Sequence, residues 1–340
     1  CARGISIQLG FFGGLGRASK QGVLVKGGNF LEALAQTEIV VFDKTGTLTK
    51  GVFEVQQIIP ANGFTEAEVL ELAALAETDS HHPIAQSIRS KYGLKLSRQR
   101  IKNLHEQAGC GVSATVDGRR VLLGKQTFLE QAEIELLPFD AIGSPVYLAV
   151  DGKYAGALLI ADQLREDAAD AIKRLRELGV RQIRMLSGDR KQEAERIANE
   201  LGLDGWKAEL LPDQKLQALE RYQQKCRSGR LVMVGDGIND APVLARADVG
   251  VAMGGLGSDA AIEAADVVLM TDEPGKLATA IETARMTRRL VWQNITLAFV
   301  AKGVVMLLGL FGLATIWQAI FADVGVALLA VLNAARIIRV

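Results

Sequence analysis

The chain has few cysteines, and none of them is paired by spacing. The three in its 340 residues are Cys1, Cys110 and Cys226. They are scattered without a Cys-x-x-Cys pair, which excludes a zinc ribbon and a disulfide framework. This usage of cysteine fits a reducing, cytosolic setting.

The chain also lacks an excess of charge of either sign. Its 39 Lys and Arg balance its 39 Asp and Glu, and no lysine-rich arm with interleaved aromatic residues is present. Nucleic acid is therefore not an expected partner. The positive mean hydropathy of +0.18 points instead to a membrane.

No signal peptide precedes the first apolar stretch, and the chain opens with Cys rather than Met. The apolar, glycine-rich run from Ile5 to Gly16 is followed by Arg17, Lys20 and Lys26, as at the cytoplasmic exit of a membrane helix. A dozen residues cannot cross a bilayer alone. We therefore expect residues 1–18 to be the end of a transmembrane helix, and the chain to be truncated at its amino end.

Three short apolar runs each end in a polar turn, as buried strands do before a site. In an open parallel sheet, ligands bind beyond the carboxyl ends of the strands, so these turns are expected to converge. The runs are Ile39–Phe42 before Asp43-Lys44-Thr45-Gly46-Thr47, Ile183–Leu186 before Ser187-Gly188-Asp189, and Leu231–Val234 before Gly235-Asp236-Gly237-Ile238-Asn239-Asp240.

The first turn indicates phosphoryl transfer to a carboxylate. Asp43 is a competent nucleophile toward phosphorus only if the electrophile is neutralised and held in line. Asp43 and Asp236 are oxygen ligands suited to Mg²⁺, and the Thr45 carbonyl is a third. Lys215 and Ser187 are expected to hold the phosphoryl oxygens, with support from helix amino ends.

Taken together, these phrases resemble those of a P-type ATPase, and the core resembles the haloacid-dehalogenase superfamily of aspartyl phosphotransferases. The resemblance implies a Mg²⁺-dependent enzyme that takes its phosphoryl group from ATP. The catalytic residues that it implies are Asp43, Lys44, Thr45, Thr47, Ser187, Gly188, Asp189, Lys215, Asn239 and Asp240, with Asp43, Thr45 and Asp236 on Mg²⁺.

A soluble phosphatase of the same superfamily is the nearest rival enzyme. It would carry a second Asp two residues after the nucleophile as general acid and base, and here that position is Thr45. Without that acid an aspartyl phosphate is hydrolysed slowly. This suits a pump, which must keep its phosphoenzyme while an ion moves.

The alternation of strands and helices predicts an α/β Rossmann-like domain that is split by an inserted α+β domain. A helix that begins near Asp162 is expected from the helical spacing of residues Leu164 to Leu178, with Gly179 as its stop. The expected domains are residues 19–50 and 161–284 for phosphorylation, 51–160 for nucleotide binding, and 287–340 for two membrane helices.

The insert carries a second group of candidate residues. Heavy-metal pumps of this family have a nucleotide-binding domain with Glu, Ser and His-Pro followed by Gly-x-Gly. The resemblance therefore implies that ATP is bound by Glu77, Ser80, His82, Pro83, Gly109 and Gly111. An imidazole can stack on or hydrogen-bond to a purine, and glycines permit close backbone approach.

Two apolar runs near the carboxyl end, Ile295 to Leu313 and Ile316 to Ile338, are each long enough to span a bilayer. Arginines flank their outer ends, and the turn between them has none, so both ends are expected in the cytoplasm. Lys302 and Asp323 lie inside these runs, at depths of roughly 12 to 17 Å from the turn. Charged residues at matched depth usually mark an ion path.

The resemblance to the heavy-metal branch also implies the transported ion. Zinc, cadmium and lead pumps have a Lys and an Asp-x-Gly in these helices, matched by Lys302 and Asp323-Val324-Gly325, whereas copper pumps differ here. Cys1 resembles the last cysteine of a Cys-Pro-Cys-like motif. Carboxylate with thiolate favours Zn²⁺ or Cd²⁺. Gln8 and Arg3-Gly4 depart from the family pattern in the first helix.

The expected activity is export of a divalent heavy-metal cation by a multi-pass protein of the plasma membrane, with its catalytic domains in the cytoplasm. Membrane lipid, ATP and the ion are the expected partners. The chain contains no Thr-Gly-Glu actuator loop. The alternative is a truncated or decayed pump that binds nucleotide without transport, for want of upstream actuator and membrane segments.

Overall fold

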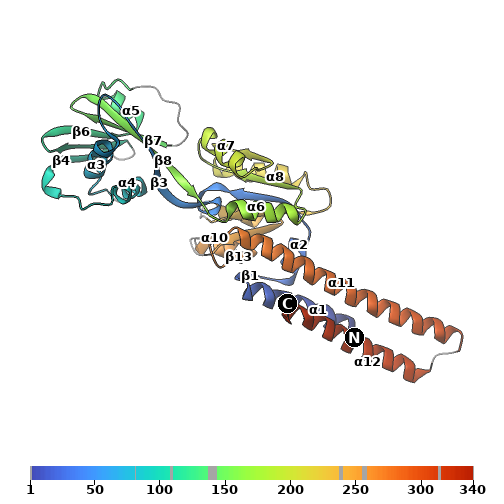
Figure 1. Cartoon of the computed structure of the whole chain (residues 1–340). Helices are drawn as coiled ribbons and strands as arrows, with labels where there is room; N and C mark the ends of the chain where they lie inside the picture. The colour runs from blue at the N-terminus through green and yellow to red at the C-terminus, as the bar shows by residue number, and fades with distance from the viewer. Residues whose placement is uncertain are drawn as a thin grey trace. The chain divides into compact units, whose positions relative to one another are not determined.

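The computed structural model describes residues 2–80, 82–107, 110–136, 144–236, 240–254, 259–312 and 315–339. The chain forms two compact units, which are described separately. The first combines residues 1–48 with 165–340, and the second consists of residues 49–164 (Figure 1).

The first unit is built on a seven-stranded sheet in which β1 alone runs antiparallel to its neighbour. The order across the sheet is β1-β13-β12-β11-β2-β9-β10. The strands are β1 (Val23–Val25), β2 (Thr37–Asp43), β9 (Gln182–Leu186), β10 (Gly205–Lys207), β11 (Arg230–Gly235), β12 (Val249–Met253) and β13 (Val267–Leu269).

The centre of this sheet brings the predicted turns to one edge. In β2 every residue but Glu38 is buried, as expected for a parallel strand covered on both faces. Phe42 is opposite Val234 of β11, and Asp43 is opposite Leu186 of β9. The turns that follow β11, β2 and β9 therefore lie next to one another at one edge of the sheet.

Helices cover the sheet, and the apolar stripe of α8 shows why. Leu219 and Tyr222 pack with Ile39, Val41 and Met233 in one buried cluster. The helices of this unit are α1 (Ala2–Lys20), α2 (Gly28–Ala35), α6 (Ala168–Glu177), α7 (Lys191–Glu200), α8 (Pro212–Gln223), α9 (Ala241–Arg246), α10 (Asp259–Ala264), α11 (Gly275–Leu310) and α12 (Ile316–Arg339).

The prediction of a helix from near Asp162 was wrong at its start. Strand β8 (Lys153–Leu164) continues through this segment, and α6 begins only at Ala168. Asp162 is buried and accepts a hydrogen bond of 2.5 Å from the Thr49 hydroxyl, while Leu164 still pairs with Thr49 across the sheet. This strand pairing outweighs the local helical spacing.

Helix α11 links the sheet domain to the apolar carboxyl-terminal hairpin without a break (Figure 1). It runs through the predicted domain boundary at residues 284–287. Near its start, Thr283 donates over 2.8 Å to the side-chain oxygen of Gln21, the residue that follows α1. Farther along, buried Asn294 donates to the Ala330 carbonyl and accepts from Asn333, both on α12. Polar contacts therefore hold the three helices together.

The second unit is an antiparallel sheet in the order β3-β8-β7-β6-β5-β4, with the α-helices α3, α4 and α5 in its described part. Its α3 starts with a capping box, in which Thr65 and Glu68 each bond the other's backbone amide. The elements besides β8 are β3 (Thr49–Pro60), α3 (Glu66–Ala76), α4 (Pro83–Tyr92), β4 (Ile101–Gln107), β5 (Gly111–Val116), β6 (Arg119–Gly124), α5 (Gln126–Glu130) and β7 (Ser144–Val150).

Among the described residues, α11 (Gly275–Leu310) is the one helix with the length and hydropathy to cross a membrane, and 11% of its most apolar window is buried. The apolar part of α12, Val324–Ile337, is shorter than that criterion. The second predicted span, Ile316 to Ile338, therefore stays a prediction.

We predict that Leu148→Ala destabilises the second unit by about 2–5 kcal/mol, because it opens a cavity in a close-packed core. Leu148 is fully buried in β7, whereas Leu94, the control site, is 69% exposed. Hydrogen exchange by mass spectrometry would report faster exchange across β6, β7 and β8 for Leu148→Ala. Equal protection in Leu148→Ala and Leu94→Ala would contradict the assignment of this core.

Candidate active site

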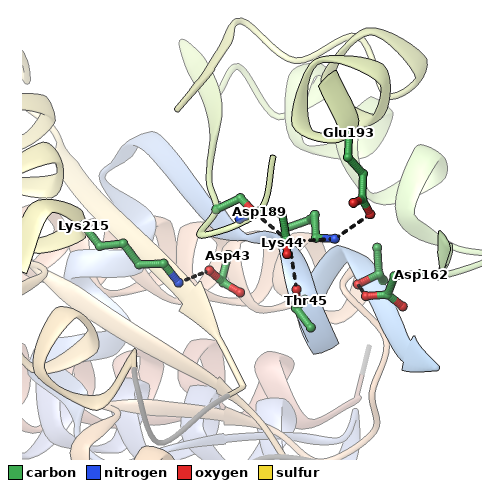
Figure 2. Close-up of polar contacts among 9 residues, drawn as sticks. Asp43, Lys44, Thr45, Asp162, Asp189, Glu193 and Lys215 are labelled. Carbon is green, nitrogen blue, oxygen red and sulfur yellow. Dashed lines mark hydrogen bonds and ion pairs between the residues drawn. The ribbon is translucent and has the colours of Figure 1, made fainter. Parts of the chain in front are cut away.

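A half-buried lysine joins two carboxylates at the carboxyl edge of the first unit's sheet. The Lys215 ammonium lies 2.5 Å from Asp43 Oδ1 and 2.9 Å from Asp240 Oδ1 (Figure 2 shows the first contact). Asp43 ends β2, Lys215 lies in the first turn of α8, and Asp240 immediately precedes α9. Elements distant in sequence thus place one cation between two anions.

Asp236 completes a group of three carboxylates. One ligand atom from each of Asp43, Asp236 and Asp240 lies within 4.8 Å of the others. Burial and the negative charge of Asp240 raise the pKa of Asp43 to about 7, against the opposing effect of Lys215. Burial and Asp240 likewise raise the pKa of Asp236 to about 6. The group therefore favours a bound cation.

The residues present fit Mg²⁺. The three clustered carboxylates offer the hard oxygen ligands that this ion prefers. Beside them, the Thr47 hydroxyl is fully buried, and no group in the described part of the chain bonds to it. Buried hydroxyls are rarely left unpaired, so the site is suited to an additional oxygen-rich group. That the Thr45 carbonyl is a ligand of the metal stays a prediction.

The turn after Asp43 needs glycine at position 46 for two reasons. Gly46 has φ +71°, and a Cβ built there would lie 1.5 Å from Asp236 Oδ2. The backbone therefore approaches the carboxylate more closely than any side chain allows. Arg165 donates to the Gly46 carbonyl over 2.8 Å and holds the turn from the other side.

Lys44 forms an ion-pair cluster with two carboxylates, and its ammonium points away from Asp43 (Figure 2). Its ammonium lies 2.7 Å from Asp189 Oδ2 and 2.9 Å from Glu193 Oε1. Burial opposes the charge of Lys44, but the two carboxylates raise its pKa. Asp189 also accepts from the hydroxyls of Ser187 and Thr45. The cluster ties the β2 turn to the β9 turn, which includes Gly188.

Some predicted residues lie outside the described part of the chain. These are Cys1, Gly109 and Asn239, together with the Asp323 side chain; the Asp323 backbone belongs to α12. Lys302 lies on α11, about 12 Å from the helix end at Leu310, and Asp323 lies about 10 Å from the start of α12 at 1.5 Å per residue. These two positions are similar along their helices, and the role of both residues in an ion path stays a prediction.

The second unit places four of the predicted nucleotide residues around one pocket. Its volume is about 150 Å³, and Glu77, Ser80, His82 and Gly111 line it. Glu77 is 8% exposed, its Oε2 has no hydrogen-bond partner among the described residues, and burial raises its pKa. A buried carboxylate oxygen without a donor indicates a ligand group that donates to it.

His82 and Pro83 form the start of α4. The His82 Nδ1 accepts a hydrogen bond from the Ile84 amide over 3.2 Å, which leaves Nε2 to carry the proton. Pro83 occupies the first turn, where its missing amide proton costs nothing. The ring is therefore fixed in orientation at the pocket.

The packing of the sheet also requires glycine at position 111, apart from the predicted close approach of a nucleotide. A Cβ there would lie 2.4 Å from the Leu123 carbonyl oxygen and 2.8 Å from the Cα of Gly124. The two glycines let β5 and β6 pack closely. A larger cavity of about 610 Å³ lies between β3 and α4, but it shares only Pro83 with the predicted set, and the unpaired Glu77 oxygen favours the smaller pocket.

Sequence reasoning missed Glu193 and Arg165. Glu193 lies in the first turn of α7, where acidic residues are common without a partner. Arg165 follows the second unit directly, and its distance in sequence from Gly46 gives no signal of their contact. Neither residue belongs to a recognisable motif.

Residues 37–248 match the family described as haloacid dehalogenase-like hydrolase. This range covers more than half of the chain and includes Asp43, Lys215 and Asp240. The chain belongs to this family. The predicted fold class was a haloacid-dehalogenase-like Rossmann-type domain with an inserted α+β domain and a carboxyl-terminal transmembrane helical hairpin. The haloacid-dehalogenase-like fold with its inserted domain is confirmed, together with an apolar carboxyl-terminal helix.

Similarity to individual proteins extends over the whole chain. A cadmium, zinc and cobalt-transporting ATPase of Bacillus subtilis (strain 168) is 55% identical over 340 residues, which are 100% of this chain and 48% of the relative. A zinc-transporting ATPase of Synechocystis sp. is 52% identical over 339 residues, 100% of this chain and 47% of the relative. The chain thus spans about half the length of these curated relatives.

A solved structure is also similar to this chain over nearly its whole length. The crystal structure of a zinc-transporting PIB-type ATPase in the E2.Pi state superposes with a TM-score of 0.89 and 38% identity, over 99% of this chain and 56% of that one. The predicted resemblance to the heavy-metal-transporting P-type ATPases is confirmed.

We predict that stability falls with rising pH in the absence of divalent metal. The pKa of Asp43 is about 7 in the folded protein against an ordinary 3.8, so between about pH 4 and 7 the folded state keeps a proton that the unfolded state releases. Stability from this group is full below that window and is lost as pH rises through it. Thermal unfolding in EDTA from pH 5 to 8 should show a smaller decline for Asp43→Asn than for wild type.

Parallel pH curves for the two proteins would contradict the raised pKa of Asp43. Asp170→Asn, on the exposed part of α6, is the matched control and should follow the wild-type curve.

We predict that Gly46→Ala lowers the unfolding midpoint more than Gly179→Ala. Both glycines have positive φ, +71° and +75°, but a Cβ at Gly179 meets nothing within 4 Å. Gly179→Ala therefore costs backbone strain alone, about 1–2 kcal/mol, whereas Gly46→Ala must also displace Asp236. Equal midpoints in thermal unfolding would show that the close approach to Asp236 is not fixed.

Proposed function

We propose that this chain is the catalytic part of an ATP-driven exporter of a divalent heavy-metal cation, most favourably Zn²⁺ or Cd²⁺, and that ATP phosphorylates it on Asp43. The observation that carries the proposal is the Lys215 ammonium, 2.5 Å from Asp43 and 2.9 Å from Asp240 at the edge of a parallel sheet. This places a cation where charge develops during transfer of a phosphoryl group to a carboxylate.

In the proposed reaction, an Asp43 oxygen attacks the terminal phosphorus of ATP. A bond between that oxygen and phosphorus forms while the bond to the bridging oxygen breaks, and ADP leaves with the bond's electrons. Lys215 neutralises the transferred oxygens, and the unpaired Thr47 hydroxyl donates to them. The Ser187 hydroxyl, which donates to Asp189 in this structure, turns to the phosphoryl oxygens when they are bound. Mg²⁺, held by Asp43 and Asp236, supplies further neutralisation when it is bound.

Lys44, Gly188 and Asp189 have positioning roles in this proposal. Because the Lys44 ammonium is paired with Asp189 and Glu193, it fixes the backbone of the turn and leaves the phosphoryl contacts to Lys215. Asp240 orients Lys215 through its 2.9 Å contact. Asn239 is assigned to the same turn by motif alone.

The proposed phosphoenzyme is long-lived because no acid stands two residues after the nucleophile. Thr45 occupies that position, is exposed, and its hydroxyl donates to Asp189 over 3.4 Å. A threonine hydroxyl paired in this way cannot activate water as a carboxylate does. Hydrolysis then awaits a group from outside the described residues.

The second unit is the proposed nucleotide-binding domain, and the sheet of the first unit is the phosphorylation domain. Glu77, Ser80, His82 and Gly111 surround the pocket, and the unpaired Glu77 oxygen supports an amine-bearing ligand such as adenine. Pro83 fixes the start of the helix that carries this edge of the pocket. Gly109 joins this set by motif.

The ion path is proposed to include Lys302, Asp323 and Cys1. Lys302 and Asp323 lie at similar distances from the turn-side ends of α11 and α12, and a charge at such depth is costly unless it has a function. The names of the relatives, which include zinc and cadmium, support a divalent ion. A plasma-membrane location follows, with the two catalytic units in the cytoplasm and upstream membrane and actuator segments as partners.

We predict that Asp43→Asn abolishes acid-stable labelling by [γ-³²P]ATP, because an amide cannot attack phosphorus. The chain would be joined to the upstream half of the Bacillus subtilis relative and labelled in the presence of Mg²⁺ and Zn²⁺. Asp170→Asn, an exposed carboxylate of the same unit, should keep wild-type labelling.

Retained label in Asp43→Asn would reject Asp43 as the nucleophile. Loss of label in both variants would mean that the substitutions act through folding, which the unfolding midpoints of the same preparations would reveal.

A further inference from the structure

A free thiol lies on the rim of the candidate nucleotide pocket. Cys110 is half-buried and lines the same 150 Å³ pocket as Glu77 and His82. The other free cysteine of the described residues, Cys226, packs against the core of the first unit and has no place in this pocket. Of these two thiols, Cys110 is the one that shares the pocket.

The backbone holds Cys110 in place. Its amide donates to the Gln107 carbonyl over 3.0 Å, and its carbonyl accepts from the Lys125 amide over 2.9 Å. A Cβ on Gly124 would lie 2.5 Å from that same carbonyl oxygen, so the two segments are closely packed. Cys110 therefore stays beside the pocket, because its backbone cannot withdraw without breaking these contacts.

The pocket contains a buried polar atom that has no hydrogen-bond partner among the described residues. Glu77 is more than nine-tenths buried, lines the pocket, and has an Oε2 with no partner in the described part of the chain. This observation is independent of the thiol. Because Cys110 and Glu77 line the same small pocket, a group attached to Cys110 would compete with a ligand for that space.

We propose that Cys110 is a modification site through which a small disulfide blocks nucleotide binding. The inference rests on the proposed nucleotide role of the pocket. The Cys110 thiol releases its proton to water, and its sulfur attacks one sulfur of the disulfide. A new S–S bond forms, the old one breaks, and the second half leaves as a thiolate that takes up a proton. A thiol reductant reverses the exchange.

The size of the pocket makes even a small adduct effective. A volume of about 150 Å³ corresponds to roughly five water molecules at about 30 Å³ each. The aminoethylthio group that cystamine transfers has four non-hydrogen atoms and fills most of that space. Its ammonium would also lie near Glu77 and Glu106, which line the pocket and attract a cation.

The test uses the 340-residue chain in detergent micelles, with trinitrophenyl-ATP fluorescence as the binding assay. Cystamine treatment of the wild type is expected to weaken nucleotide affinity by tenfold or more, and dithiothreitol to restore it. Cys226→Ser should lose affinity in the same way. In Cys110→Ser, whatever its starting affinity, treatment should leave the affinity unchanged.

A second measurement needs no variant. Mass spectrometry of the wild type should show that ATP slows the modification of Cys110 by tenfold or more and leaves the modification of Cys226 unchanged. Equal modification rates with and without ATP, or unchanged affinity after full modification of Cys110, would overturn the inference while the untreated chain still binds nucleotide. Failure of the untreated chain to bind would overturn the nucleotide role of the pocket, and the inference with it.

Discussion

The contact between Lys215 and the carboxylates of Asp43 and Asp240 is the constraint on which the rest of the first unit depends. The two aspartates are 4% and 3% exposed, and two buried carboxylates repel each other unless a cation lies between them. The cation comes from α8, so α8 must begin at the sheet edge where β2 and β11 end. The apolar residues Leu219 and Tyr222 of α8 hold the helix on the sheet and so keep the ammonium in place. The packing of the core therefore also positions the charged side chains of the site in this unit.

Two further contacts define the space in front of Asp43. The ion pairs of Lys44 with Asp189 and Glu193 tie the β2 turn to the β9 turn. On the other side, Gly46 lets the backbone approach Asp236, and Arg165 bonds the Gly46 carbonyl. The nucleophile Asp43 thus belongs to a metal-suited group of carboxylates, and the turn that follows it is held by the ion pairs of Lys44. Such preorganisation lowers the cost of orienting groups during reaction.

The sequence predicts the strands and the convergence of their polar ends well, because buried parallel strands are continuous apolar runs and their carboxyl ends share an edge. The sequence predicts less about which side chains form ion pairs with one another. The sequence singles out Lys215 for the phosphoryl oxygens, but it does not reveal that Lys215 pairs with Asp43 and Asp240 or that Lys44 pairs with Glu193, because these contacts depend on helix placement. The helix expected from near Asp162 exists as α6, but its predicted start was wrong because β8 continues through Leu164 to pair with β3. The motif residue Gly111 was predicted for nucleotide approach, and its close contact with Gly124 could not be seen from spacing.

Metal-dependent formation of the phosphoenzyme tests the central claim most directly, since it joins the Asp43 site to the proposed ion path. The measurement compares acid-stable labelling by [γ-³²P]ATP with Zn²⁺, Cd²⁺, Cu⁺ or no transported metal, all with Mg²⁺, in the chain joined to the upstream half of its Bacillus subtilis relative. The account predicts label that rises with Zn²⁺ or Cd²⁺ and not with Cu⁺. Stimulation by Cu⁺ alone, or no label with any metal, would contradict it.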